Sequence, residues 1–357
     1  MRNLTAGAAL WTCVFAIAVA SMPRGASADC AGPVSRPIEL GVSGGNIHSI
    51  NKKHASCFNG TLGSEVQDGS GKKFILSNNH VLDDTNKGKR GDLIVQPGLA
   101  DVACVQDPST AVANLSRSVK INFSGGTNTV DAAIAEVIPG DVSSSILNIG
   151  PIASTTVAPS PGLPVQKQGR TTCLTTGTIS AVGAHLKIHY GKKVATFVNQ
   201  ILINVQDFAG PGDSGSLIVT QDSCPQAVGL FFAGSADQSQ SVANPISPAL
   251  SKLHVSMTGG CTSVRSAPPA VTAEQAGNAT VSPDLVTSAT AVRDRHEDEL
   301  MKIPGAVGTA IGMSDTPGQP AINVYIEKMT PEAQAVAPKE VEGLPVKLIE
   351  NGGFVAY

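Results

Sequence analysis

Three polar residues, His80, Asp131 and Ser214, have the types and local settings that nucleophilic catalysis requires. Ser214 lies in the glycine-rich stretch GPGDSGSLIV at 210–219, which is also compatible with an ordinary turn before a buried strand. A serine hydroxyl is a weak nucleophile at neutral pH, so it needs a base, usually histidine, and an acceptor that orients this base. The sequence must therefore supply a histidine and a carboxylate from other elements.

His80 and Asp131 are the candidates for these two roles. His80 follows the strand-like run FILSNN, where a loop begins, and the other six histidines follow no comparable strand end. Asp131 begins the apolar run DAAIAEVI, where a buried carboxylate would have to accept hydrogen bonds. Alone, each residue is more typical of a structural histidine or a solvated strand edge. The order His, Asp, Ser, with all three contexts present, favours a catalytic triad over a glycine-rich turn.

The motifs around these residues resemble those of the chymotrypsin-like (trypsin-like) serine peptidases. SNNHV resembles the histidine motif, DAAIAEV the aspartate motif and GDSGS the nucleophile motif. LSNNHVL and the later HEDEL…GAVGTAIG segment are similar to bacterial trypsin-like peptidases and to the related plant leaf-width regulator proteases. The resemblance covers residues 40–262 well and the C-terminal segment more loosely.

The resemblance implies a mainly β fold with two six-stranded antiparallel barrels of the chymotrypsin type and the triad in the cleft between them. His80 and Asp131 would come from the first barrel and Ser214 from the second. His80 would take the proton of Ser214 and return it to the leaving group, while Asp131 holds the imidazole. The backbone N–H groups of Gly212 and Ser214 would form the oxyanion hole.

The resemblance also implies a specificity pocket. Phe208 matches its base, and Phe232, Ala233 and Gly234 match the wall that pairs with the substrate backbone. An aromatic residue at the base of the pocket argues against substrates with Lys or Arg at this position, so we expect a preference for small or apolar substrate side chains. Asp207 would reverse this preference if the loop is shifted by one residue.

The N-terminus indicates export. Arg2 precedes an apolar run from Leu4 to Ala20, and Ala26 and Ala28 offer an A-x-A cleavage site. The run has 17 residues, whereas a spanning helix needs roughly 20. We expect cleavage after Ala28, a secreted or periplasmic protein, and no stable membrane anchor after cleavage.

Composition narrows the possible partners and the redox state. Residues 1–28 hold two arginines and no acid, so the remainder has 23 basic and 28 acidic residues, a net charge of −5, and no indicated nucleic-acid surface. It keeps six cysteines, an even number without a C-x-x-C pair, which favours disulfides over metal ligation. Our hypothesis keeps each bridge within one half of the chain or ties its ends: Cys57–Cys104, Cys173–Cys224 and Cys30–Cys261.

Short apolar runs separated by Gly, Pro, Asn and Asp predict a β-rich peptidase domain over 29–262. Its barrels are expected at about 38–160 and 161–262, because the Pro-rich stretch APSPGLPV is a candidate connection. Residues 263–284 have few large apolar side chains and predict a linker. Residues 285–357 then predict a small α-β-β-α-β unit.

Two helices are expected in this unit. The first runs through Val292 and Leu300 and ends before Pro304, and the second begins with Pro331 at its first helical position. HEDEL at 296–300 lacks the second histidine that a zinc-binding helix needs four residues after the first. We therefore expect its charges on a solvated helix face.

Together these features predict a secreted serine-type endopeptidase, a hydrolase of polypeptides that uses no metal and no organic cofactor. One alternative is a catalytically silent or self-blocked binding module on the protease scaffold, with the C-terminal unit blocking the cleft. Another is an esterase with the same triad. Since no I-V-G-G-type segment follows a basic cleavage site, Asp213 needs a partner other than a freed amine.

Overall fold

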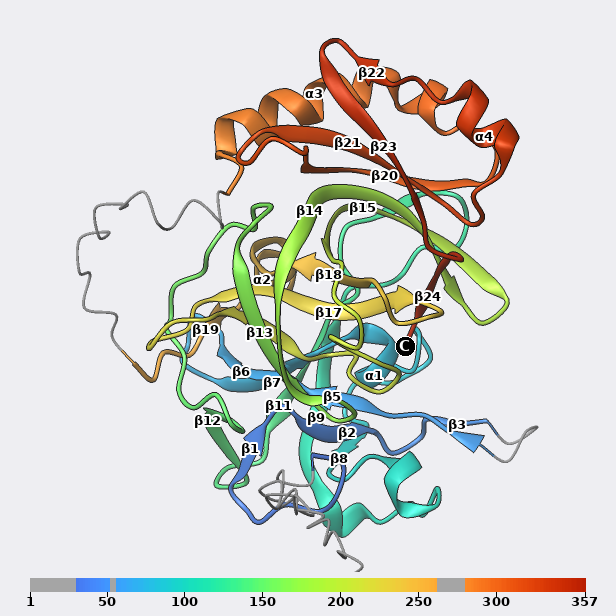
Figure 1. Cartoon of the computed structure of the whole chain (residues 1–357). Coiled ribbons are helices and arrows are strands. Elements are labelled where there is room, and N and C mark those ends of the chain that lie inside the picture. Colours follow the sequence, from blue (N-terminus) through green and yellow to red (C-terminus); the bar gives the residue numbers. More distant parts are fainter. Residues whose placement is uncertain (1–29, 52–55, 262–279) are drawn as a thin grey trace, which may run out of the picture.

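The computed structural model describes residues 30–51, 56–261 and 280–357. The expected signal peptide and most of the expected linker lie outside these ranges. Within these ranges, every helix is too short or too polar to cross a membrane. The remaining chain forms two barrels and a C-terminal unit that covers one side of the second barrel (Figure 1).

The first barrel is a closed ring of antiparallel pairs. Its strands are β2 (Val42–Asn46), β5 (Gly60–Leu62), β6 (Ser64–Gln67), β7 (Lys73–Ser77), β8 (Leu93–Val95), β9 (Ala111–Ser118) and β11 (Ala133–Val137). β5 and β6 are halves of one strand interrupted at Gly63, so six strands close the ring: β5 pairs with β2, and β6 pairs with β7. A Cβ on Gly63 would lie 2.0 Å from the carbonyl oxygen of Gly215, so glycine permits the close approach of the two barrels.

The second barrel closes in the same way, with six strands each paired to two neighbours. The strands are β13 (Pro164–Gly169), β14 (Cys173–Tyr190), β15 (Lys193–Ile203), β16 (Leu217–Thr220), β17 (Ala227–Ser235) and β18 (Ser241–Pro245). Apolar side chains fill both barrels, among them Leu62, Ile134 and Phe231. The predicted mainly β fold of two six-stranded antiparallel barrels is therefore confirmed.

Short elements complete the peptidase region. The strands are β1 (Ile38–Leu40), β3 (Ile50–Asn51), β4 (Ser56–Cys57), β10 (Thr127–Asn128), β12 (Val142–Ile146) and β19 (Ser256–Met257). The helices are α1 (Asn79–Leu82), η1 (Leu99–Val102), η2 (Pro108–Thr110) and α2 (Ile246–Leu253). Of these, α1 matters most for the site because it follows β7 directly and carries His80.

The small C-terminal α/β unit is also present, and it extends the sheet of the second barrel. It contains α3 (Pro283–Leu300), β20 (Ala306–Met313), β21 (Pro320–Ile326), α4 (Pro331–Val336), β22 (Glu340–Val341), β23 (Leu344–Glu350) and β24 (Phe354–Ala356). β20 pairs with β14, and β21 and β23 continue outward. The Thr330 side chain caps α4 by accepting a hydrogen bond from the N–H of Ala333, and Pro331 is the first helical residue.

The disulfides correct part of our hypothesis. The bridges are Cys30–Cys173, Cys57–Cys104 and Cys224–Cys261. Only the predicted Cys57–Cys104 bridge is confirmed, and the Cys173–Cys224 and Cys30–Cys261 pairings are wrong. The N-terminal segment lies along β2, where the carbonyl of Cys30 accepts a hydrogen bond from the N–H of Ser43, and it reaches the start of β14. Strand pairing therefore joins segments that are distant in the chain, which the expectation of bridges within one half overlooked.

Candidate active site

The end of β7 and the segment before β11 place His80 beside Asp131. Nδ1 of His80 lies 2.6 Å from Oδ2 of Asp131, and the backbone N–H of His80 donates to Oδ1 at 3.2 Å. Asp131 is fully buried, and its own backbone is held by the side chains of Asn78 and Asn244. The carboxylate therefore fixes both the position and the orientation of the imidazole.

Tyr190, at the end of β14, adds a third donor to Asp131. Its hydroxyl donates to Oδ2 at 2.7 Å, and its ring meets that of His80 edge to face at 5.9 Å between centroids. Burial raises the pKa of Tyr190 well above its usual value, and the negative charge of Asp131 raises it further. The hydroxyl therefore remains a donor at ordinary pH.

The turn before β16 presents Ser214. Gly212 has φ +101°, and a Cβ there would lie 2.5 Å from Oγ1 of Thr171, so both the backbone angle and the available space require glycine. In the described part of the chain, the N–H groups of Gly212 and Ser214 donate to no other protein group. They are therefore free to stabilise an oxyanion, as the resemblance implies.

Asp213 is held by a buried network beneath this turn. Its carboxylate accepts hydrogen bonds from the backbone N–H groups of Thr171, Thr172 and Gly210. Nζ of Lys167 lies 3.4 Å away, and both side chains of this ion pair are completely buried. Burial lowers the pKa of Lys167, and the charge of Asp213 opposes this shift. Lys167 thus supplies the partner that Asp213 was expected to need.

The backbone oxygen of Tyr357, the last residue of the sequence, contacts both His80 and Ser214. Nε2 of His80 lies 2.8 Å from this oxygen, and Oγ of Ser214 donates a short hydrogen bond to it. Oγ of Ser214 also lies 3.2 Å from the carbonyl oxygen of Phe232. Two side chains from different barrels therefore contact the same carbonyl group.

The protonation of His80 follows from this geometry. Burial by itself lowers the pKa of His80, but the charge and hydrogen bond of Asp131 and the hydrogen bond to the carbonyl of Tyr357 outweigh it and raise the pKa. Both ring nitrogens face acceptor oxygens, which favours the doubly protonated imidazolium. In this arrangement His80 holds the carbonyl and is not available as a base.

The expected pocket residues occupy two different environments. Phe232, Ala233 and Gly234 lie on β17, and the latter two pair with β24. Phe208 is 1% exposed and packs inside the second barrel, with Nζ of Lys167 6.0 Å from its ring centroid. That Phe208 forms the base of the pocket stays a prediction.

Sequence reasoning overlooked Tyr190, Asn244 and Tyr357. All three reach the site through contacts between segments more than 50 residues apart. A local pattern gives no signal for such contacts. The sequence offered one signal, the scarcity of tyrosine: the described chain contains three tyrosines, and two of them lie at this site.

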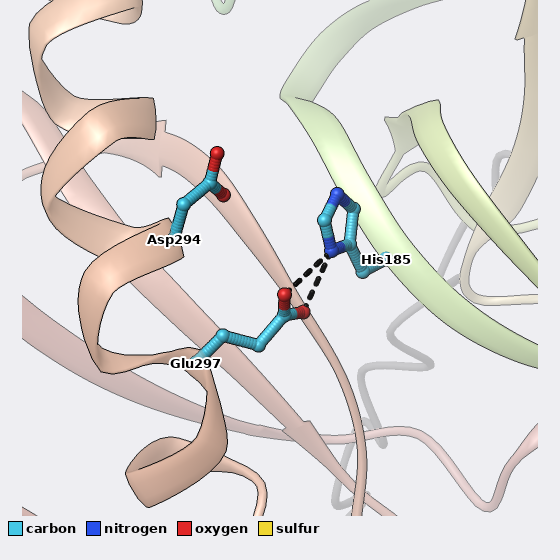
Figure 2. Close-up of side chains that lie close together, drawn as sticks. All are labelled: His185, Asp294 and Glu297. Carbon is cyan, nitrogen blue, oxygen red and sulfur yellow. Dashed lines mark hydrogen bonds and ion pairs between the residues drawn. The ribbon is translucent and has the colours of Figure 1, made fainter.

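A second polar cluster joins α3 to β14. His185, Asp294 and Glu297 each place one ligand atom within 4.8 Å of the others (Figure 2). The guanidinium of Arg293, which is almost fully buried, contacts this group: its Nε lies 2.6 Å from Asp294 and its Nη2 lies 3.4 Å from His185. This positive charge occupies the place that a cation would need, so the cluster fits an ion-pair anchor better than a metal site. Glu297, which was expected on a solvated face, faces His185 instead.

Comparisons with known proteins find similarity at the level of structure alone. No family model matches the chain, and no curated protein matches it. A glutamic-acid-specific serine protease aligns at 17% identity over 62% of this chain and 100% of its own, with a TM-score of 0.44. Protease A of Thermobifida fusca aligns at 18% identity over 57% and 93%, with a TM-score of 0.41. The chymotrypsin of Cellulomonas bogoriensis aligns at 20% identity over 56% and 91%, with a TM-score of 0.39.

These similarities are weak in both sequence and superposition. The double-barrel assignment therefore rests on the closed strand pairing of the chain itself. A relation to the plant leaf-width regulator proteases stays a prediction.

Proposed function

We propose that this chain is a secreted serine endopeptidase that hydrolyses peptide bonds through His80, Asp131 and Ser214. One observation carries the proposal: the imidazole that Asp131 orients and the hydroxyl of Ser214 contact the same carbonyl oxygen. A carbonyl group bound here lies within hydrogen-bond reach of both the hydroxyl that would attack and the imidazole that would act as its base. The geometry thus supports acyl transfer.

The steps follow from these residues. With a substrate in the cleft and His80 neutral, Ser214 transfers its proton to Nε2 of His80 as Oγ attacks the carbonyl carbon. The negative oxygen that forms would accept hydrogen bonds from Gly212 and Ser214, each worth about 3–4 kcal/mol in a comparable protease. His80 then protonates the leaving amine. Water, deprotonated by His80, attacks the acyl-enzyme and releases the acid product and Ser214.

Export agrees with the cysteine chemistry. Three disulfides in the described chain indicate an oxidising compartment. Cleavage of the signal peptide after Ala28 would leave all six of these cysteines in the mature protein. We expect secretion or a periplasmic location.

The test is reaction of the mature protein with a fluorophosphonate probe. Labelling is expected at Ser214 and lost in Ser214→Ala, together with a roughly 10⁴- to 10⁶-fold fall in kcat on peptides. Ser216→Ala is the matched control, because Ser216 lies in the same turn but donates its hydroxyl hydrogen to the carbonyl of Asp213. Labelling that survives in Ser214→Ala would contradict the proposal, as would no labelling in either the intact protein or a variant without residues 355–357.

The esterase alternative uses the same oxyanion and the same triad. Matched amide and ester substrates with identical acyl groups separate the two. An endopeptidase cleaves internal bonds of polypeptides, so cleavage of esters without any cleavage of amides would overturn the peptidase assignment.

A further inference from the structure

The last strand of the chain ends between His80 of the first barrel and Ser214 of the second, at the place that we call the cleft. β16 covers β17 only as far as Leu230, which leaves the following edge of β17 uncovered on that side. β24 fills this edge as an antiparallel strand, with Ala356 opposite Ala233 and Val355 opposite Gly234. Figure 1 shows β24 running from the C-terminal unit to the chain end near α1. Adding an extended peptide to a free strand edge is a common mode of peptide recognition.

The side chain of Tyr357 occupies a defined place beside β17. Its ring lies so close to Gly234 that a Cβ there would be 2.8 Å from Cε2, and its centroid lies 6.0 Å from that of Phe231. Its hydroxyl donates a short hydrogen bond to the carbonyl of Ser235. Burial raises the pKa of Tyr357 to about 12, and the charge of Asp237 contributes to this rise. The neutral phenol therefore has both an apolar surface and an acceptor for its hydroxyl.

The backbone of Tyr357 lies where a reacting residue would lie. Its N–H donates to the carbonyl of Phe232 at 3.3 Å, and its carbonyl meets His80 and Ser214. The ring of Tyr357 thus contacts Gly234, its N–H bonds to Phe232 on β17, and its backbone oxygen contacts Ser214.

We infer that the cleft binds an extended peptide with an aromatic residue next to the nucleophile, and that residues 355–357 occupy this binding site as an intramolecular substrate mimic. The inference rests on the proposed function and names its substrate class. It differs from the preference for small or apolar side chains that Phe208 suggests, because the side chain beside Gly234 is large and aromatic. It also makes the C-terminal unit a tethered competitor of substrate.

The tether explains how so short a segment stays bound. Phe354 is fully buried and packs against Tyr325 at 5.8 Å between ring centroids, whereas the three residues after it are only half-buried. The His185–Glu297 anchor (Figure 2) holds the unit on β14. A hydrogen bond from Arg293 to the carbonyl of Gly183 adds a second attachment. Attachment at these points gives the tail a high effective concentration at the cleft.

The first experiment measures access to Ser214 in the intact mature chain. Tyr357→Ala should speed fluorophosphonate labelling by roughly tenfold, since it removes most of the buried ring. Tyr357→Phe should label almost as slowly as the parent, and Val336→Ala, exposed on α4, should match the parent. Labelling of Tyr357→Ala no faster than that of the parent would overturn self-occupancy.

The second experiment measures preference. A variant without residues 355–357, which keeps Phe354 in its cluster, is given succinyl-Val-Ala-X-nitroanilides with X as Tyr, Phe, Ala, Glu or Arg. The kcat/KM for Tyr and Phe should exceed that for Ala by roughly tenfold or more. Equal or better cleavage after Ala, Glu or Arg would overturn the aromatic preference.

A third measurement separates this inference from the proposed function. Fluorescein-labelled Val-Ala-Tyr is titrated with the same truncated variant, and unlabelled Val-Ala-Tyr and Val-Ala-Ala serve as matched competitors. Binding that unlabelled Val-Ala-Tyr displaces and Val-Ala-Ala does not would support the site even if Ser214 proved unreactive. A reactive Ser214 without such binding would leave the peptidase standing and refute the site.

Discussion

The two barrels share a plan of six antiparallel strands, but their longest strands differ. The longest strand of the first barrel, β9, has eight residues, whereas β14 and β15 of the second have 18 and 11. The start of β14 pairs with β13, and its far half extends past β13 and exposes an edge that β20 and β24 cover. The first barrel thus supplies His80 and Asp131 from compact strand ends, while the second also builds a platform for the C-terminal unit.

The difference shows that two barrels of the same architecture can have different roles: the first contributes side chains to the active site, and the second also holds the segment that we propose inhibits it. An uncovered strand edge attracts further strands, and here the added strands come from the same chain. The C-terminal unit covers the exposed edge of β14, and β24 continues from this unit to the active site. Residues 355–357 therefore lie next to Ser214. The first barrel has no comparable extension within the described residues.

Deleting residues 285–357 should have the largest effect on stability. It would expose apolar side chains of the second barrel, such as Leu186 and Ile188, that share a buried cluster with the unit. We expect a loss of roughly 5 kcal/mol in the free energy of unfolding, measured by urea denaturation. Unchanged melting together with unchanged activity would contradict both the stabilising and the inhibitory role of the unit.

The second-largest effect on stability is expected from breaking the buried ion pair of the second barrel, Lys167–Asp213. Lys167→Met leaves the carboxylate of Asp213 buried without its counter-charge, so we expect a loss of about 3–5 kcal/mol. The matched change in the first-barrel region is Arg36→Met, which removes a partly exposed pair with Asp141 and should cost about 1 kcal/mol. If Lys167→Met and Arg36→Met lose the same unfolding free energy in urea denaturation, the predicted difference between the two ion pairs is wrong.

Tyr190→Phe tests whether the second barrel tunes the first-barrel pair. Without the hydroxyl, Asp131 loses a donor, becomes a stronger acceptor for His80, and the pKa of His80 rises further. We expect kcat/KM to fall by roughly three- to tenfold at neutral pH and its acid limb to move to higher pH, because catalysis needs neutral His80. A fall in kcat/KM without a shifted pH profile would indicate a merely structural role.

Glu297→Gln should have the smallest effect. Burial opposes ionisation of Glu297, but the hydrogen bond and charge of His185, with help from Arg293, lower its pKa. Since the folded pKa is depressed, the stabilisation is present above the usual glutamate pKa and disappears as pH falls through the lowered value. We expect Glu297→Gln to lose about 1 kcal/mol of unfolding free energy at pH 7, measured by urea denaturation, and to differ little from the parent at strongly acid pH.

Asp298→Asn is the matched control for this change. Asp298 is exposed on the same helix, and its removal should leave the stability of the unit unchanged. An equal effect of both variants would show that the charge of the helix, rather than the anchor to β14, determines the loss.

Local pattern carried much of the prediction. The alternating apolar runs predict strands because a half-buried strand repeats every two residues, and Thr330 and Pro331 predict a helix start because their local chemistry fits its first turn. The motifs also identified His80, Asp131 and Ser214 as a group, since each lies at the end of such an element. These features depend on a few neighbouring residues.

Contacts between distant segments were decided by the tertiary structure. Two of the three disulfides were mispaired, because Cys30 and Cys173 are neighbours in space although they lie in different halves of the peptidase domain, which leaves Cys224 to pair with Cys261. The hydroxyl of Tyr190 on Asp131 and the partner of Asp213, Lys167, likewise depend on how the strands register.

The sequence by itself determined which residues could react and which segments become strands, because side-chain chemistry and short-range periodicity act locally. Only the tertiary structure decided what fills the cleft. Tyr357 lies 143 residues from Ser214 in the chain and reaches it because β14 leaves an edge that the C-terminal unit must cover. That placement follows from strand pairing and burial across the whole fold, which no local pattern encodes.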